Sequence, residues 1–334
     1  MVMTKYTIAL LPGDGIGPEV VDATVKVMDA LQQKTNIEFE YKTYMVGDAE
    51  KERSGTALPQ ATIDGVKAAD ACLFACVGAT AKETILPLRQ MFNLYANLRP
   101  AKAYPGVPAV RPETDIMIIR ENTEGIYKMI GHRSPRSAFN VRVITWEASE
   151  RIVRYAFEWA KKNGKKKVTA VHKANVLDYT DELFLEAARS VAAEYPEMEY
   201  NELIVDAASM WLVMYPESFE VVVTTNMFGD ILSDVTAGLV GGLGMAPSGN
   251  VGDDMCIFEP VHGSAPDIAG KGIANPAACM LSAAMMLEWL GENEAAKLIE
   301  NAVLKVLEEG KTLTPDLKGK ATTVEFAEAV AKTL

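Results

Sequence analysis

Several residue types that mark particular protein classes are scarce in this chain of 334 residues. It has three histidines and four cysteines without a Cys-x-x-Cys pair, so no zinc site of familiar spacing is expected. Cys72, Cys76, Cys256 and Cys279 lie in apolar stretches and are expected to be core residues in a reducing compartment. Any metal bound by this chain is therefore expected to have oxygen ligands.

Positive charge and long apolar runs are also scarce. The net charge is −12, and the one basic cluster, KKNGKKK at residues 161–167, is no extended nucleic-acid surface. No apolar run reaches the ~18 residues that cross a bilayer, and the first residues lack the pattern of a signal peptide. We therefore expect a cytoplasmic protein that binds neither nucleic acid nor membrane.

The chain alternates between short apolar runs and amphipathic segments, which predicts an α/β fold with a parallel sheet covered by helices. Its length suits about two domains. The predicted strands are residues 6–11, 37–46, 71–77, 114–119, 141–145, 167–172, 199–205 and 219–225. The predicted helices are residues 18–33, 58–68, 147–162, 178–194, 207–215, 277–290 and 292–309. Three more are a segment that holds Arg89 and ends at 97–100, one after a break at 226–229 and a short one near residue 334.

The first predicted strand runs into a glycine turn, Gly13-Asp14-Gly15-Ile16-Gly17. The dinucleotide fingerprint GxGxxG needs its third glycine one place later, where this chain has Pro18. Proline suits the first position of a helix. The pattern predicts a tight βα turn close to a ligand, but not a conventional dinucleotide site.

Three carboxylates follow predicted strands. Asp230 and Asp234, in VVVTTNMFGDILSD at residues 221–234, share one helix face and repel each other unless a cation lies between them. Asp206 follows another strand, and strand ends are where α/β sheets bind ligands. The trio favours a Mg²⁺ or Mn²⁺ site. The alternatives are an acidic solvated face and, for Asp206, a helix N-cap.

Charged and phenolic side chains suited to an acidic substrate lie between residues 89 and 173. Arg89, Arg99 and Arg120 suit a substrate with two or three carboxylates, because guanidinium groups bind carboxylates bidentately. Tyr127 and Lys173 are candidates for the acid and the base. Taken singly, the alternatives are surface ion pairs for the arginines, a packed tyrosine and an exposed lysine.

A glycine-rich segment at residues 259–276, EPVHGSAPDIAGKGIANP, combines permissive backbone with His262, Asp267 and Asn275. Glycines let backbone N–H groups approach a pyrophosphate. A carboxylate hydrogen-bonds a ribose 2′-hydroxyl and repels a 2′-phosphate. A generic glycine-rich loop is the alternative.

Six motifs together resemble the β-decarboxylating dehydrogenases, the family of isopropylmalate, isocitrate and homoisocitrate dehydrogenases. They stand in the family's order over almost the whole chain: LPGDGIGPE, LRQMFNLYANLRPAK, RENTEGIY, HKANVL, TTNMFGDILSD and FEPVHGSAPDIAGKGIANP. The resemblance implies a two-domain fold with a dinucleotide site of its own kind, and an interlocked homodimer or dimer-based oligomer. A large domain, residues 1–99 and 241–334, would carry the NAD site. A small domain, residues 100–240, would carry the metal ligands, the acid and base, and the dimer interface.

The resemblance also implies a role for each candidate residue. Lys173 and one metal aspartate would reach the site across the dimer interface, with Tyr127 as the acid. The implied metal ligands are Asp206, Asp230 and Asp234, and the implied substrate contacts are Arg89, Arg99, Arg120, Ile85, Leu86 and Asn175. The implied NAD contacts are His262, Gly263, Ser264, Ala265, Asp267 and Asn275.

The implied reaction is oxidation of a 3-carboxy-2-hydroxy acid at C2 with loss of its 3-carboxylate as CO₂. Asp267 matches NAD-dependent relatives, since NADP-dependent ones carry a basic residue there. Ile85 and Leu86 suit an isopropyl group, which favours 3-isopropylmalate and leucine biosynthesis. Homoisocitrate and isocitrate stay open, because HKANVL also resembles homoisocitrate dehydrogenases and Lys82 suits a distal carboxylate. A metal-dependent lyase without nucleotide and a non-catalytic binding protein are remoter alternatives.

Overall fold

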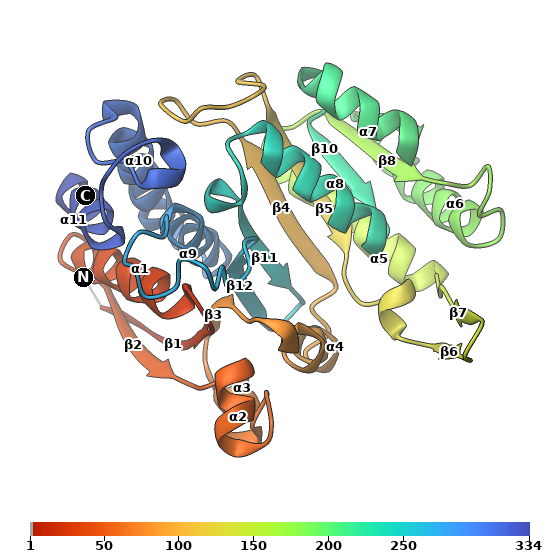
Figure 1. The fold of residues 1–334 in the computed structure, drawn as a ribbon. Helices are drawn as coiled ribbons and strands as arrows, with labels where there is room; N and C mark the ends of the chain where they lie inside the picture. The colour runs from red at the N-terminus through yellow and green to blue at the C-terminus, as the bar shows by residue number, and fades with distance from the viewer. Residues whose placement is uncertain (1–2) are drawn as a thin grey trace. The chain divides into compact units, whose positions relative to one another are not determined.

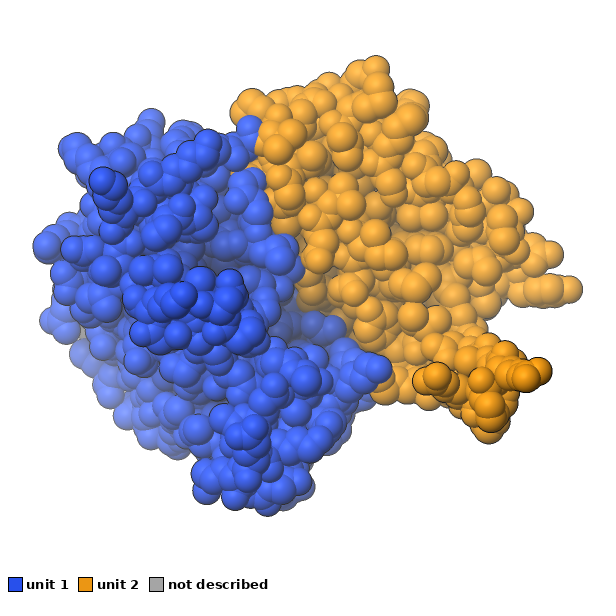
Figure 2. All heavy atoms as spheres, viewed as in Figure 1, with its two compact units in different colours: residues 1–92, 104–109, 241–334 blue, residues 93–103, 110–240 orange. Residues whose placement is uncertain are grey.

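The chain forms two compact units in the computed structural model, which describes residues 3–334. Unit 1 comprises residues 1–92, 104–109 and 241–334, and unit 2 comprises residues 93–103 and 110–240 (Figure 2). Met1 and Val2, which the predicted large domain includes, lie outside the described residues. The functional roles that the sequence assigns to the two domains stay predictions.

Unit 1 contains a mostly parallel sheet in the order β2-β1-β3-β12-β11, in which only β11 runs antiparallel to its neighbour (Figure 1). All residues of β3 are buried, as expected for a strand covered on both faces. The strands are β1 (Thr4–Gly13), β2 (Ile37–Thr43), β3 (Ala71–Cys76), β11 (Pro247–Val251) and β12 (Cys256–Pro260).

The helices of unit 1 pack on this sheet and on each other. Helices α1 and α9 lie against the strands, α10 packs on α9, and α11 packs on α1. The helices are α1 (Gly17–Gln32), α2 (Asp48–Ser54), α3 (Gln60–Ala68), α4 (Ile85–Met91), α9 (Ala277–Trp289), α10 (Asn293–Glu309) and α11 (Thr323–Thr333). Short 3₁₀ helices cover η1 (Ala79–Glu83), η4 (Leu243–Met245) and η5 (Pro315–Leu317).

Unit 2 contains strands in the order β4-β5-β10-β8-β9, parallel except for the β4–β5 pair. A separate antiparallel hairpin is formed by β6 and β7. The strands are β4 (Ala96–Lys102), β5 (Asp115–Glu121), β6 (Gly131–Arg133), β7 (Ala138–Asn140), β8 (Lys167–His172), β9 (Glu199–Ile204) and β10 (Val221–Thr224).

The helices of unit 2 form two pairs, α5 with α6 and α7 with α8. Ile116 and Ile118 of β5 share a buried cluster with Leu212 and Leu232. Because alternate residues of a strand point to the same face, α7 and α8 cover one face of the sheet. The helices are α5 (Trp146–Lys162), α6 (Thr180–Ala192), α7 (Val205–Met214) and α8 (Asn226–Leu239), with η2 (Ile126–Lys128) and η3 (Pro216–Ser218).

The α/β class with a large parallel sheet is confirmed, but several local predictions are wrong. Residues 141–145 form no strand, and only an isolated bridge joins Val143 to Gly125. Residues 226–229 do not break the chain but form the first turn of α8, where Arg120 holds the side chain of Asn226. Strand β12 extends into the predicted glycine-rich loop. No helix within residues 3–334 is long and apolar enough to cross a membrane.

Candidate active site

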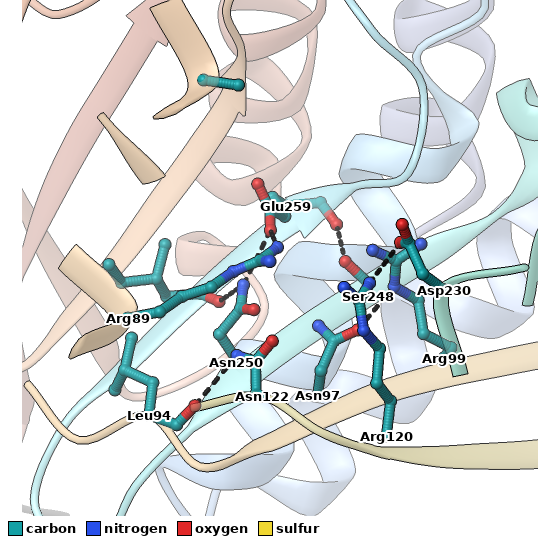
Figure 3. Close-up of polar contacts among 12 residues, drawn as sticks. Arg89, Leu94, Asn97, Arg99, Arg120, Asn122, Asp230, Ser248, Asn250 and Glu259 are labelled. Atoms are coloured by element: carbon teal, nitrogen blue, oxygen red, sulfur yellow. Dashed lines mark hydrogen bonds and ion pairs between the residues drawn. The ribbon is translucent and has the colours of Figure 1, made fainter. Parts of the chain in front are cut away.

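Asp230 is the centre of a polar cluster at the carboxyl end of β5 in unit 2. Arg120, 1% exposed, forms an ion pair with Asp230. It also donates from Nη2 to Oδ1 of Asn226 at 2.7 Å. Tyr127 donates from its hydroxyl to Oδ2 of Asp230 at 2.8 Å. Figure 3 shows the contact between Arg120 and Asp230. One predicted substrate arginine, the predicted acid and one predicted metal ligand therefore meet.

Asp234 lies one turn further along α8. The Nη1 atom of Arg99, a buried residue of β4, lies 3.8 Å from its carboxylate. Arg99 also donates to Oδ1 of Asn97 at 2.7 Å. Burial raises the pKa of the Asp234 carboxyl, Arg99 opposes this shift, and the like charge of Asp230 adds to it. The two aspartates therefore lie close enough for their like charges to influence each other.

The predicted base forms a second cluster in unit 2. Lys173 follows β8, and its Nζ forms an ion pair with Asp206. The hydrogen bond from Lys173 lowers the pKa of the Asp206 carboxyl. Asp206 lies in the first turn of α7, whose N-cap is Ile204 without a side-chain cap bond. The N-cap alternative for Asp206 is therefore wrong.

A buried ion pair that the sequence does not predict, between Asp181 and Arg142, holds the backbone at Lys173. Asp181, fully buried in the first turn of α6, accepts the backbone N–H of Lys173 at 2.6 Å. Its other oxygen pairs with Arg142, which also donates to Oγ1 of Thr225 at 2.9 Å. The signal available in the sequence was one of three acids near a helix start, Asp178, Asp181 and Glu182, which are usually caps or solvated residues.

The carboxylate oxygens of Asp206, Asp230 and Asp234 suit a divalent cation, but the three side chains do not meet within one chain. Within residues 3–334, no group of three His, Cys, Asp or Glu side chains is placed to hold a metal ion. Asp206 belongs to the Lys173 cluster, whereas Asp230 and Asp234 belong to the Arg120 cluster. The side chains of Asp206 and Asp234 are 67% and 60% exposed, so both are open to ligands from outside the chain.

In unit 1, the predicted substrate arginine Arg89 is buried on α4. Its Nη2 donates to Glu259 of β12 at 2.8 Å, and Nδ2 of Asn250 donates to the same oxygen at 2.8 Å (Figure 3). Its Nε is buried without a hydrogen-bond partner among the described residues. Ile85, on the same helix, is also buried, and Leu86 is half-buried. Arg89 is thus fixed in place with unused donor capacity.

The predicted cofactor loop follows β12 in unit 1. Burial lowers the pKa of His262, and its Nε2 is buried without a hydrogen-bond partner among the described residues. Ala265 has a positive φ of 38°, a strained conformation that recurs at ligand sites. Asp267 is exposed, and Asn275 donates to Asp316 at 2.9 Å. An orphaned imidazole nitrogen beside a strained turn fits a nucleotide site.

The remaining predicted residues lie on loops. Gly263 is exposed and Ser264 is half-buried in the cofactor loop. Asn175 is exposed in the turn after Lys173. Asp316 and Glu259 are the polar neighbours that the sequence missed in unit 1, because each lies far along the chain from the residue it contacts.

Comparisons with known proteins agree on one family. A family model described as isocitrate/isopropylmalate dehydrogenase matches residues 7–330. A 3-isopropylmalate dehydrogenase of Archaeoglobus fulgidus is 52% identical over 98% of this chain and 99% of its own. An isocitrate/homoisocitrate dehydrogenase of Thermus thermophilus is 50% identical over 98% of both chains.

A solved structure agrees with the fold. The crystal structure of isocitrate dehydrogenase from Methylococcus capsulatus matches with a TM-score of 0.94 and 46% identity. The match covers 98% of this chain and 99% of that one.

Proposed function

The chain belongs to the isocitrate/isopropylmalate dehydrogenase family, and from this premise we propose that it converts 3-isopropylmalate to 2-oxoisocaproate with NAD and Mg²⁺ or Mn²⁺. The family acts on small molecules as oxidative decarboxylases, and its members generally use a nucleotide and a divalent metal. The observation that carries the proposal is the convergence of Arg120 and Tyr127 on Asp230. It supports the proposal because an anion-binding group, the proposed proton donor and the proposed metal ligand would then act at one place.

The chain's own residues account for the proton transfers. Lys173 would take the proton of the C2 hydroxyl, and Tyr127 would return a proton to C3 after CO₂ leaves. Arg99 and Arg120 would hold the substrate carboxylates by bidentate hydrogen bonds. Bound NAD would accept the hydride from C2, and a cation bound by the aspartates would draw electrons from the C2 oxygen.

The two separate clusters of unit 2 support a site completed by a second copy of the chain. In a symmetric homodimer, Lys173 and Asp206 of one copy would complete the Asp230 cluster of the other. Helix α7 presents an apolar surface for such a contact, and Ile231 of the neighbouring helix α8 is also exposed. The exposed large apolar residues on and just after α7 are Met210, Trp211, Val213, Met214 and Tyr215. An isolated monomer would leave this apolar surface in water.

The specificity residues support 3-isopropylmalate and NAD. Ile85 is buried next to half-buried Leu86, which suits an isopropyl group better than a carboxylate. Asp267 is exposed, which suits a hydrogen bond to a ribose 2′-hydroxyl. Homoisocitrate is the second candidate, because a relative named isocitrate/homoisocitrate dehydrogenase is 50% identical and one named homoisocitrate dehydrogenase is 44% identical. We propose the cytoplasm as the site of action.

The test is an absorbance assay at the NADH band with three substrates: 3-isopropylmalate, homoisocitrate and isocitrate. NAD and NADP are compared by kcat/KM, with Mn²⁺ present and with EDTA as a control. We expect the highest kcat/KM for 3-isopropylmalate with NAD, and loss of turnover in EDTA. Turnover of another substrate alone, or a preference for NADP, would overturn the corresponding choice. CO₂ release without NADH formation would indicate a lyase.

A matched pair of variants tests the metal assignment. Asp230→Asn should abolish Mn²⁺-dependent turnover while the protein stays folded. The control is Asp254→Asn, the same change at an exposed loop position. Retained activity in Asp230→Asn would mean that the motif is only an acidic helix face.

A further inference from the structure

The first βα turn contacts the two loops of unit 1 that carry predicted ligand residues. Its motif, GDGIGPE, has glycines but not the dinucleotide spacing. Backbone N–H groups of Asp14, Ile16 and Gly17 donate at 2.9 Å to the carbonyls of Cys76, Ser264 and Asp14, respectively. These groups are therefore not available to bind a phosphate.

We propose that this turn positions two loops separately. Asp14 holds in place the loop that leads into the substrate helix α4, and Glu19 holds in place the cofactor loop. The inference rests on the proposed function, because it assigns substrate contacts to α4 and NAD contacts to the loop that ends at Asn275. Asp14 and Glu19 are positioning residues, since each acts on ligands through other residues.

Asp14 reaches the substrate helix through a second carboxylate, Asp48. The two oxygens of Asp14 accept three backbone N–H groups, from Asp48 at 2.7 Å, Ala49 at 3.1 Å and Gly78 at 3.0 Å. These bonds fix the start of α2 against the end of β3. Because Asp14 holds the backbone N–H of Asp48, these bonds also fix the position of the Asp48 side chain.

Asp48 in turn fixes the start of η1, the short helix before α4. Its carboxylate accepts the N–H of Ala79 at 2.9 Å, and both the N–H and the hydroxyl of Thr80 at 2.9 and 2.6 Å. A Cβ at Gly78 would lie 2.2 Å from Oδ2 of Asp48, so only glycine permits this approach. Because η1 runs directly into α4, the pair determines where Ile85 lies.

Glu19 reaches the cofactor loop directly. Its Oε1 accepts the N–H of Ala274 at 2.9 Å and the hydroxyl of Thr323 at 3.1 Å. The neighbouring bond from Ile16 to Ser264 fixes the other end of the loop. Gly15, with φ of +59°, lets the backbones approach, since a Cβ there would lie 1.9 Å from the carbonyl oxygen of Ser264.

The two carboxylates differ in how many oxygens they use. Asp14 uses both, so Asp14→Asn places an NH₂ group against a backbone N–H. Glu19 uses one, so Glu19→Gln can keep both bonds through its carbonyl oxygen, whereas Glu19→Ala loses both. Asp22→Asn, an exposed position on α1, is the matched control.

The first measurement compares the KM values for 3-isopropylmalate and NAD in these variants. Asp14→Asn should raise the KM for 3-isopropylmalate about tenfold and leave the KM for NAD nearly unchanged. Glu19→Ala should do the reverse, and Glu19→Gln and Asp22→Asn should resemble the wild type. Thr80→Val, a milder change in the Asp48 contacts, should act in the same direction as Asp14→Asn. Equal effects on both KM values, or a fall in kcat alone, would overturn the proposal.

Two further measurements do not depend on turnover. Fluorescence titration with NADH should show weaker binding in Glu19→Ala but not in Asp14→Asn. Amide hydrogen exchange should become faster at residues 262–275 in Glu19→Ala, and at residues 78–85 in Asp14→Asn. If the wild type turns over none of the three substrates, the proposed function fails, while hydrogen exchange still decides whether the turn controls the two loops. Uniformly faster exchange in both variants would contradict separate control.

Discussion

The hydroxyl of Tyr127 donates a 2.8 Å hydrogen bond to Oδ2 of Asp230, and Arg120 forms an ion pair with Oδ1 of the same carboxylate. The guanidinium carbon of Arg120 also lies 5.2 Å from the centre of the Tyr127 ring. The proposed acid is therefore oriented by the carboxylate that would bind the cation, so its role is testable by removing one oxygen atom.

Tyr127→Phe removes the proton donor and keeps the ring. We expect kcat to fall by about 100-fold or more, the usual contribution of a general acid, with little change in the KM for Mn²⁺. Steady-state kinetics measure both, and Tyr179→Phe, at an exposed tyrosine, is the control. A raised KM for Mn²⁺ with unchanged kcat would mean that Tyr127 only orients Asp230.

Asp181→Ala leaves Arg142, whose side chain is 13% exposed, without its buried partner. We expect the free energy of unfolding to fall by about 3–5 kcal/mol, because an unpaired buried charge is strongly unfavourable. Glu197→Ala breaks the exposed pair with Lys161 and should leave the free energy of unfolding nearly unchanged. Urea unfolding followed by circular dichroism measures both. Equal losses would contradict the structural importance of the Asp181 pair.

His262 should make stability depend on pH. Burial lowers its pKa in the folded protein below the ordinary 6.5. As the pH drops below 6.5 the unfolded chain binds the proton before the folded protein does, so stability falls from there and levels off below the folded pKa. His262→Gln removes this contribution. The unfolding free energy of the wild type minus that of the variant should therefore fall from pH 7.5 to pH 5.5. A constant or rising value would contradict the burial of a neutral imidazole.

Elements with strong local signals could be predicted from the sequence. The strand β8 was predicted with its observed bounds, and the fully buried strand β3 was predicted within one residue. The strand β3 is an apolar run before Gly78, and β8 places Val168, Ala170 and Val171 between polar ends, so both are visible in their own composition. The shared face of Asp230 and Asp234 also followed from helical spacing alone.

Elements stabilised by distant partners could not be predicted. Strand β4 contains Arg99 and Pro100, which argue against a strand until the side-chain partners of Arg99 are known. Asn226 begins a helix because Arg120 holds its side chain across 106 positions of sequence. Local composition carries no record of such contacts.

The candidate site shows the same division. The chemistry of its residues and the family resemblance predict which residues belong to the site, but the pairing of these residues depends on tertiary contacts. Arg89 meets Glu259, 170 positions away, and Lys173 meets Asp206 rather than the other two aspartates. Sequence spacing could not separate the aspartates into two clusters.

Mixed dimers test whether the dehydrogenase site is completed by a second copy of the chain. Lys173→Ala and Asp230→Asn subunits with different affinity tags are co-expressed, and the mixed dimers are purified through both tags. Each parent dimer should be inactive. The mixed dimer should recover about half of the wild-type rate, because one of its two sites combines an intact Lys173 with an intact Asp230. Mixed dimers as inactive as their parents, or subunits that form no mixed dimer, would contradict the shared site.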